Sequence, residues 1–301
     1  MCSILESPGL ELLPPPVLVS RLKTRAAELH MLPAVAIDAM EMAKDPECSI
    51  AAYAAVVERD VKLATDMLKI TNSMVYSPSV PILSLHQAIL RLGLKECQTL
   101  ILTASFTSIM TRISLDQEWI REVLWQHSFN TALLATHLNN TFRFGFQGEE
   151  FTAGLIHDFG RTLLAVTVPE EFPAIDPLDF EESPEQLVRE QQAVGTDHCR
   201  LGAWYAIQQQ LPLPIREVIL WHHQPEMAQD GRLLTSLIAV ADHMANHLQR
   251  FKEATGYDPS SNPFVPILAK FGNAQFEKQF LKLSSSLMDK AQHDSEAMVL
   301  I

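Results

Sequence analysis

Apolar residues recur at intervals of three and four along most of this chain, which is the spacing of one face of an α-helix. Residues 17–30 show the pattern directly after a run of prolines, and residues 85–93 show it after Ser84, a residue type favoured at helix N-termini. Residues 95–110 are apolar nearly all round, which predicts a buried helix. The strict alternation typical of strands is hard to find. The sequence therefore predicts an all-α fold.

A second helical series begins near position 115. Long amphipathic patterns cover residues 116–142 and 232–251, and a polar helix is expected near 274–292. Residues 168–186 carry four prolines and many acidic side chains, including the pair at 181–182, and we interpret them as mostly solvated loop. These patterns divide the chain into an N-terminal tail (1–16), a helical N-terminal part (17–114), a helical part that carries most histidines (115–250) and a partly helical C-terminal extension (251–301).

Several single residues carry local structural signals. Ser49 is expected to cap the helix after it, and Gly93 to end one. Asn72, with the serine after it, is interpreted as a C-terminal cap or turn bonded to nearby backbone, in preference to a ligand-binding residue. Trp125 and Trp221 are expected in the core or in a pocket wall.

Composition limits the classes of partner. The chain has 301 residues, 47% of them apolar, which is enough for at least one full core. It carries 36 acidic against 23 basic residues, a net charge of −13, and so lacks the basic footprint that nucleic acids and anionic membranes require. Its four cysteines are widely spaced, which indicates reduced thiols. With no signal-peptide pattern and no span-length apolar run, we expect a cytoplasmic protein that binds neither membrane nor nucleic acid.

Seven histidines and aspartates in the second half lie on or at the ends of predicted helices whose other face is apolar. They are His127, the pair His157-Asp158, His198, the pair His222-His223, and Asp242. Side chains so placed point into a helical bundle, where imidazole and carboxylate groups commonly hold iron, manganese or zinc. The alternative is that His157, His222 and His223 bond the carbonyls at helix C-termini. From spacing alone both interpretations stay open. His243 and His247, further along the last helix, are interpreted as solvent-facing.

The ordered set H…HD…H…HH…D resembles the HD superfamily of metal-dependent phosphohydrolases. The wider pattern resembles one branch of it, the HDOD domain (HD-related output domain) of bacterial signalling proteins. The matching stretches include "LPAVAIDAMEMAKDPECSIAAYAAVVERDVKLATDMLKITNS", "ILSLHQAILRLGLKECQTLIL", "WQHSFNTALLATHL", "FTAGLIHDFGRTLLA" and "DHCRLGAWYAIQQQLPLPIREVILWHHQPE". They occur in order and cover roughly residues 20–227. The resemblance implies N-terminal helices packed on an HD-like helical bundle.

Similarity to the two-metal HD-GYP phosphodiesterases implies a role for each candidate. His127 would bind the first metal with His157 and Asp242, and Asp158 would bridge the two ions. The histidines at 198, 222 and 223 would serve the second ion. The cofactor is thus one or two divalent ions, which could be Fe, Mn, Zn or Mg.

Two departures from HD-GYP enzymes stand against catalysis. Those enzymes carry a lysine shortly after the HD pair, where this chain has Arg161, which keeps the charge but cannot donate a proton. Arg161 could still steady a phosphate, and with Asp158 it is the candidate catalytic pair. The enzymes also carry a Gly-Tyr-Pro motif, whereas Gly231 here is followed by Arg232 and Leu233. A cyclic-di-GMP phosphodiesterase is therefore not expected.

Two functions compete. The first, which we favour, is a regulatory signalling module that acts through protein partners, with the metal or a nucleotide or phosphate ligand tuning its conformation. The second is a metal-dependent phosphohydrolase acting on a nucleotide or another phosphate ester, with a metal-activated water as nucleophile. The sequence indicates neither the partner nor the oligomeric state.

Overall fold

The computed structural model describes residues 13–25, 33–42, 45, 47–72, 80–113, 115, 117–181 and 185–298. Within those ranges every regular element is a helix, so the all-α prediction is confirmed. The α-helices are α1 Pro16–Arg25, α2 Ala34–Met42, α3 Ile50–Val57, α4 Val61–Thr71, α5 Leu85–Arg112, α6 Glu118–Phe142, α7 Glu149–Ile156, α8 Phe159–Thr167, α9 Phe172–Ile175, α10 Glu185–Val194, α11 His198–Gln208, α12 Leu213–Trp221, α13 Arg232–Phe251, α14 Val265–Leu268 and α15 Phe276–Met298.

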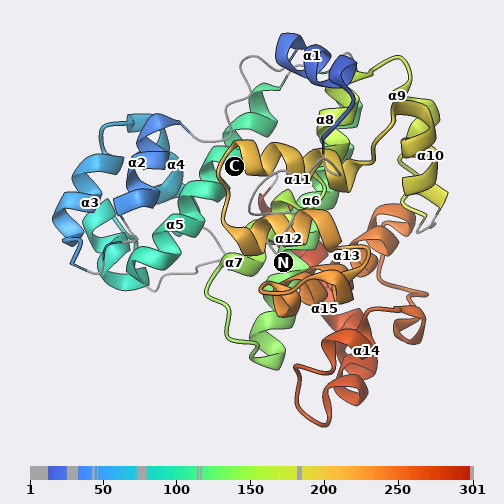
Figure 1. Ribbon diagram of the computed structural model, residues 1–301. Coiled ribbons are helices and arrows are strands. Elements are labelled where there is room, and N and C mark those ends of the chain that lie inside the picture. The colour runs from blue at the N-terminus through green and yellow to red at the C-terminus, as the bar shows by residue number, and fades with distance from the viewer. Residues whose placement is uncertain are drawn as a thin grey trace.

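Helices α2, α3 and α4 gather around α5 as a separate lobe at the left of Figure 1. The predicted caps are present: the Ser49 hydroxyl accepts from the Ala52 amide at 3.2 Å, and Ser84 caps the start of α5. Gly93 ends the first helical segment of α5, as predicted: its φ of 85° and ψ of 167° are not helical, and a second helical segment begins directly after it. A glycine is needed there because other residues rarely adopt positive φ. The kink at Gly93 lets the first segment of α5 pack in the lobe and the second pack in the bundle.

Asn72 fastens the end of α4 to the chain that leads into α5. Its side-chain oxygen accepts from the Ile82 amide, and its side-chain nitrogen donates to the Ile82 carbonyl, both at 2.8 Å. The nitrogen also donates to the Leu68 carbonyl in the last turn of α4. The structural interpretation of Asn72 is therefore confirmed. The serine at position 73 lies outside the described residues.

The second half of the chain is a bundle built on α6. Helices α7, α13 and α15 pack against α6, while α11 lies between α8 and α12. Gly154 of α7 allows a close approach to α6, because a Cβ there would lie 2.7 Å from the backbone of Ala132. Trp125 stacks between Phe106 and Phe129, in agreement with its predicted core or pocket-wall position. The second half of α5 therefore shares a core with the bundle.

Helices α1 and α15 both pack on the bundle. Helix α1 contacts α8, and the Arg25 guanidinium donates to the Val166 carbonyl at 3.4 Å. Helix α15, in the predicted extension, packs along α6, where Phe276 meets Phe142 edge-on at 4.7 Å. Both ends thus stabilise the bundle. None of the helices in the described ranges combines the length and the apolar character needed to cross a membrane.

Candidate metal centre

The seven predicted histidines and aspartates meet in one place inside the bundle. His127 comes from the middle of α6, His157 and Asp158 from the turn between α7 and α8, and Asp242 from α13. His198 is the first residue of α11, and the pair 222–223 directly follows α12. Six of the seven are buried, and His223 is half-buried. Five segments distant in sequence therefore contribute one polar cluster to an otherwise apolar core.

The glycine after the HD pair makes this convergence possible. A Cβ on Gly160 would lie 1.8 Å from the carbonyl oxygen of His198, closer than atoms can approach. Only a residue without a side chain lets the start of α8 touch the start of α11. The contact brings the HD turn against the helix that carries His198.

Asp158 divides the cluster into two halves. Its Oδ2 atom lies 3.5 Å from Nε2 of His127 and 3.8 Å from Nε2 of His157. Its Oδ1 atom lies 3.4 Å from Nε2 of both His198 and His222. Each carboxylate oxygen thus faces its own pair of imidazoles. Such a carboxylate is placed to bridge two cations.

Asp242 and His223 complete the two halves. Oδ1 of Asp242 lies 3.0 Å from Nε2 of His127 and 3.5 Å from Nε2 of His157, so this carboxylate belongs to the first half. Nε2 of His223 lies 3.2 Å from Nε2 of His198, so His223 belongs to the second. The grouping matches the one that the resemblance implied.

Hydrogen bonds to the backbone determine which imidazole nitrogens face the cluster. Nδ1 of His157 donates to the Gly154 carbonyl at 2.7 Å, and Nδ1 of His222 lies 3.2 and 3.1 Å from the carbonyls of Val218 and Ile219. A carbonyl accepts only from a protonated nitrogen, so Nε2 is the nitrogen of each ring that is left to bind a cation. Both Nε2 atoms are buried without a hydrogen-bond partner. The capping and metal-ligand interpretations of His157 and His222 are thus compatible, because each uses a different nitrogen.

Charge within the cluster is balanced by neighbours. Burial alone would raise the pKa of Asp158, but His157 and Arg161 outweigh it and hold the pKa well below its usual value. Burial alone would raise the pKa of Asp242, but the neighbouring His127 and His157 outweigh it and hold the pKa well below its usual value. Burial lowers the pKa of His127. Ionised carboxylates beside imidazole nitrogens that lack a hydrogen-bond partner form a donor set that fits a divalent cation.

Arg161 is held by two carboxylates. Its Nη1 donates to Oδ2 of Asp158 at 2.9 Å, while Nε and Nη2 donate to the two oxygens of Asp176 at 2.7 and 2.9 Å. The guanidinium also stacks on Phe180, with 4.7 Å to the ring centroid. Asp176 and Phe180 thus hold the guanidinium in place, and its Nη1 in turn fixes Oδ2 of Asp158.

Two buried carboxylates that support the cluster were missed by the sequence interpretation. Asp176 lies in the segment interpreted as solvated loop, yet it is only 2% exposed and pairs with Arg161. Glu190 of α10 is fully buried, and both its oxygens lie 2.9 Å from Nδ1 of His198. No local motif marks either residue, because each gains its role from a partner outside its own helix or loop. Glu181, in contrast, is exposed as expected.

A cavity of about 430 Å³ opens onto the cluster. Asp158, His198, His223 and Asp242 line its floor, and Arg161, Gln224 and Asn246 add polar groups to its wall. Phe180 covers the first half, with its ring 4.7 Å from that of His127. Its φ of 53° is unusual for a phenylalanine, so tertiary contacts hold the ring there at a cost in backbone strain.

His243 and His247 differ from their predicted solvent-facing placement. Both are half-buried: Nδ1 of His243 lies 3.2 Å from the Tyr257 hydroxyl, and Nε2 of His247 lies 3.2 Å from the Thr255 carbonyl. The segment after α13 folds back over them, which the helical pattern of α13 could not reveal. They line a neighbouring cavity of about 390 Å³ that shares Phe180 and Asn246 with the first.

A helical bundle that collects histidines and an HD pair around a central carboxylate defines a protein of the HD type. The chain belongs to the HDOD domain family, whose model matches residues 29–225, and the resemblance noted in the sequence is thereby confirmed. An uncharacterized protein from Treponema pallidum is 24% identical over 227 residues, which is 75% of this chain. The chain spans about 44% of the length of that relative.

Solved structures share the fold at low sequence identity. An HDOD domain protein of unknown function from Geobacter sulfurreducens has a TM-score of 0.69 and 23% identity, covering 92% of this chain and 98% of its own. A candidate phosphohydrolase from Shewanella amazonensis has a TM-score of 0.65 and 17% identity, with coverage of 93% and 98%. A candidate metal-dependent phosphohydrolase from the same organism has a TM-score of 0.61 and 18% identity, with coverage of 93% and 97%. These likenesses establish the fold of this chain.

Proposed function

We propose that this chain is a metal-binding HDOD signalling module that holds two divalent ions. The observation that carries the proposal is the division of the cluster by Asp158, with one oxygen facing His127 and His157 and the other facing His198 and His222. Nitrogen-rich donor sets of this kind favour iron, manganese or zinc over magnesium.

The supporting residues orient the donors. Arg161 and Asp176 fix Asp158, and Glu190 fixes the ring of His198 with Nε2 toward the cluster. Arg161 acts as a positioning residue in this proposal, because at least three of its donors are engaged by carboxylates. A guanidinium cannot serve as a general acid in any case.

A regulatory role needs a surface for partner proteins, and the α2–α4 lobe with the start of α5 offers apolar side chains for one. Val61 is 76% exposed, Leu83 79% and Leu90 62%. Exposed apolar groups of this size favour association with another protein. Helix α5 connects these residues to the bundle, so a change at the metal centre has a direct structural route to the lobe.

The second candidate function is metal-dependent hydrolysis of a nucleotide or other phosphate ester. The cavity over Asp158 and His223 favours it, because a purely structural metal site is closed. Bound divalent ions would supply Lewis-acid activation of water and stabilise charge on a phosphoryl group. Asn246 and Gln224, in the cavity wall, would orient the phosphate oxygens as neutral donors.

Metal content and turnover together separate the two candidates. We expect purified protein to retain close to two equivalents of Mn²⁺, Fe²⁺ or Zn²⁺, and His222→Ala to lose metal while the matched change at exposed His86 does not. Turnover of a generic phosphodiester or a nucleotide panel that Asp158→Ala abolishes in a folded protein would refute a purely regulatory role. Full metal occupancy without turnover would refute hydrolysis of those substrates. A metal-free wild-type protein that takes up no ion would refute both.

A further inference from the structure

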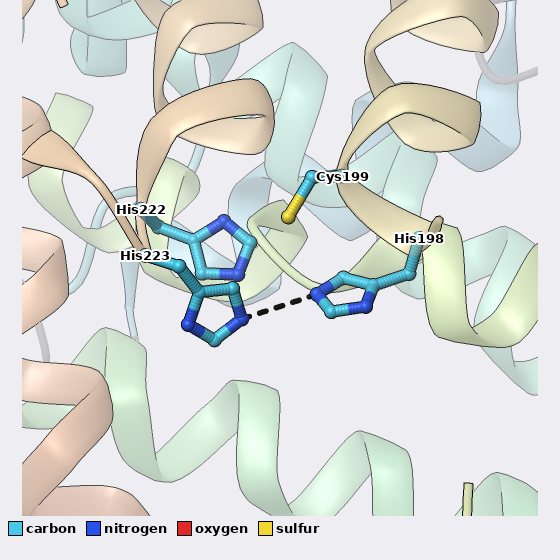
Figure 2. Close-up of side chains that lie close together, drawn as sticks. All are labelled: His198, Cys199, His222 and His223. Atoms are coloured by element: carbon cyan, nitrogen blue, oxygen red, sulfur yellow. Dashed lines mark hydrogen bonds between the residues drawn. The ribbon is translucent and has the colours of Figure 1, made fainter. Parts of the chain in front are cut away.

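Cys199 places a thiol beside the second half of the cluster. It is the second residue of α11, directly after His198, and is 4% exposed. Its Sγ and one nitrogen from each of His198, His222 and His223 all lie within 4.8 Å of one another. Figure 2 shows the sulfur and the three rings around the same space.

The spacing of these donors is close to that of a four-coordinate site. Zn–N bonds of about 2.0–2.1 Å and a Zn–S bond of about 2.3 Å give ligand-to-ligand edges of roughly 3.3–3.6 Å in a tetrahedron. The Nε2 atoms of His198 and His223 are already 3.2 Å apart. Closing the remaining distances requires side-chain shifts of about 1 Å or less on this geometry.

The nitrogens around Cys199 are prepared to bind a cation. Nε2 of His222 is buried without a hydrogen-bond partner, because Nδ1 of the same ring is directed to the carbonyls of α12. Glu190 occupies Nδ1 of His198, which leaves Nε2 as the nitrogen that faces the cluster and can bind a cation. The sulfur therefore lies next to nitrogens whose own hydrogen bonds already direct them to a common ligand.

Burial among histidines distinguishes Cys199 from the other cysteines that the structure describes. Cys97 is fully buried in α5 but belongs to no cluster of metal-ligating side chains, and Cys48 is half-buried and likewise belongs to none. Both Cys97 and Cys199 pack in the apolar core, but only Cys199 also lies within reach of three imidazoles.

We propose that Cys199 is a ligand of the second metal ion, together with His198, His222 and His223. The proposal rests on the metal binding proposed above and specifies the chemistry of one half of it. On binding, the S–H bond breaks, its proton leaves to solvent, and a sulfur–metal bond forms without any change in oxidation state. A thiolate with three imidazoles selects zinc, iron or cobalt and rejects magnesium. Oδ1 of Asp158 lies on the side of this second ion as a further donor. The first site, made of His127, His157, Asp242 and Oδ2 of Asp158, has only nitrogen and oxygen donors, so the two sites differ in their chemistry.

Cobalt titration of the full chain tests the proposal, because Co²⁺ reports its ligands spectroscopically. Visible d–d bands record binding, and a sulfur-to-cobalt charge-transfer band in the near ultraviolet records a thiolate ligand. We expect both in the wild type, with the charge-transfer band lost in Cys199→Ser while the visible bands persist. The matched variant Cys97→Ala keeps both. Zinc affinity of the second site falls at least about tenfold in Cys199→Ser, since removal of groups that only orient a ligand already costs about 10–100-fold.

Each other outcome overturns the proposal. The wild type could show the visible bands without a charge-transfer band, or the charge-transfer band could persist in Cys199→Ser. Either result would mean that the protein binds metal but that Cys199 is not a ligand. Absence of all cobalt bands would overturn the proposed metal binding as well. X-ray absorption of the zinc-loaded wild type needs no folded variant: a sulfur neighbour at about 2.3 Å is expected, and a shell of nitrogen and oxygen alone contradicts the proposal.

Discussion

Replacing Glu190 with glutamine is expected to weaken the second metal site with almost no change in shape. The carboxylate accepts from the His198 backbone amide at 2.7 Å and faces Nδ1 of the same residue at 2.9 Å. Glutamine can keep the first bond with its oxygen, but it then presents an amide N–H to Nδ1. That nitrogen must become the acceptor, so the proton moves to Nε2, the atom that faces Asp158. Metal can bind only after this tautomer is reversed.

The size of the expected loss in metal affinity follows from the hydrogen bond that Glu190→Gln removes. A buried hydrogen bond to a charged acceptor contributes about 1.5–3 kcal/mol. At about 1.4 kcal/mol for each factor of ten, the variant should bind metal at the second site roughly 10–100-fold more weakly. The same range describes the loss of groups that orient metal-bound histidines in other proteins, about 10–100-fold.

Competition against a chromophoric chelator measures this affinity directly. The matched control is Glu185→Gln, which makes the same chemical change at an exposed position of the same helix and should leave affinity unchanged. Circular dichroism establishes that Glu190→Gln remains folded. A folded variant whose affinity falls less than about threefold would refute the assigned role of the carboxylate.

Three further predictions concern stability, each measured by urea unfolding. Arg161→Ala leaves the buried Asp158 and Asp176 without their cation and should cost about 3–5 kcal/mol, so a loss under about 1 kcal/mol contradicts the pairing. Gly160→Ala places a Cβ on the His198 carbonyl and should cost about 3 kcal/mol or more, and near-neutrality would contradict the close approach of α8 and α11. Burial, with a nearby lysine, lowers the pKa of His137, so the unfolded chain binds the proton more readily. The free energy of unfolding should therefore decrease as the pH drops below about 6.5, and it should decrease less steeply in His137→Gln than in the wild type. Equal pH dependence in the two proteins would contradict this role of His137.

Local physics made much of the fold predictable. Helical periodicity and short-range caps depend on residues within one or two turns, and Ser49 and Ser84 cap their helices as expected. Gly93 ends the first helical segment of α5 as predicted, but the direction in which the second segment continues depends on where that segment can pack. The packing of α1 on α8 rather than on α2 is likewise a long-range choice.

The acidic side chains show the limit of sequence reasoning most clearly. Asp176 and Glu181 lie in the same proline-rich segment, yet one is buried on Arg161 and the other is exposed. The free energy of burying a carboxylate depends on whether a cation or a hydrogen-bond donor pairs with it in the folded protein. That partner can come from any part of the chain. Glu190 gained its place beside His198 in the same way.

For the candidate metal centre, the sequence by itself determined the identity and order of the seven donors, from His127 to Asp242. Tertiary structure decided that the two oxygens of Asp158 face opposite pairs of rings and that Nδ1 rather than Nε2 of His157 bonds the backbone. It also decided that Cys199 lies beside His198, His222 and His223. The physical reason is that the sequence specifies which side chains can bind a metal ion, whereas the direction in which each lone pair points depends on contacts between helices that are remote in sequence.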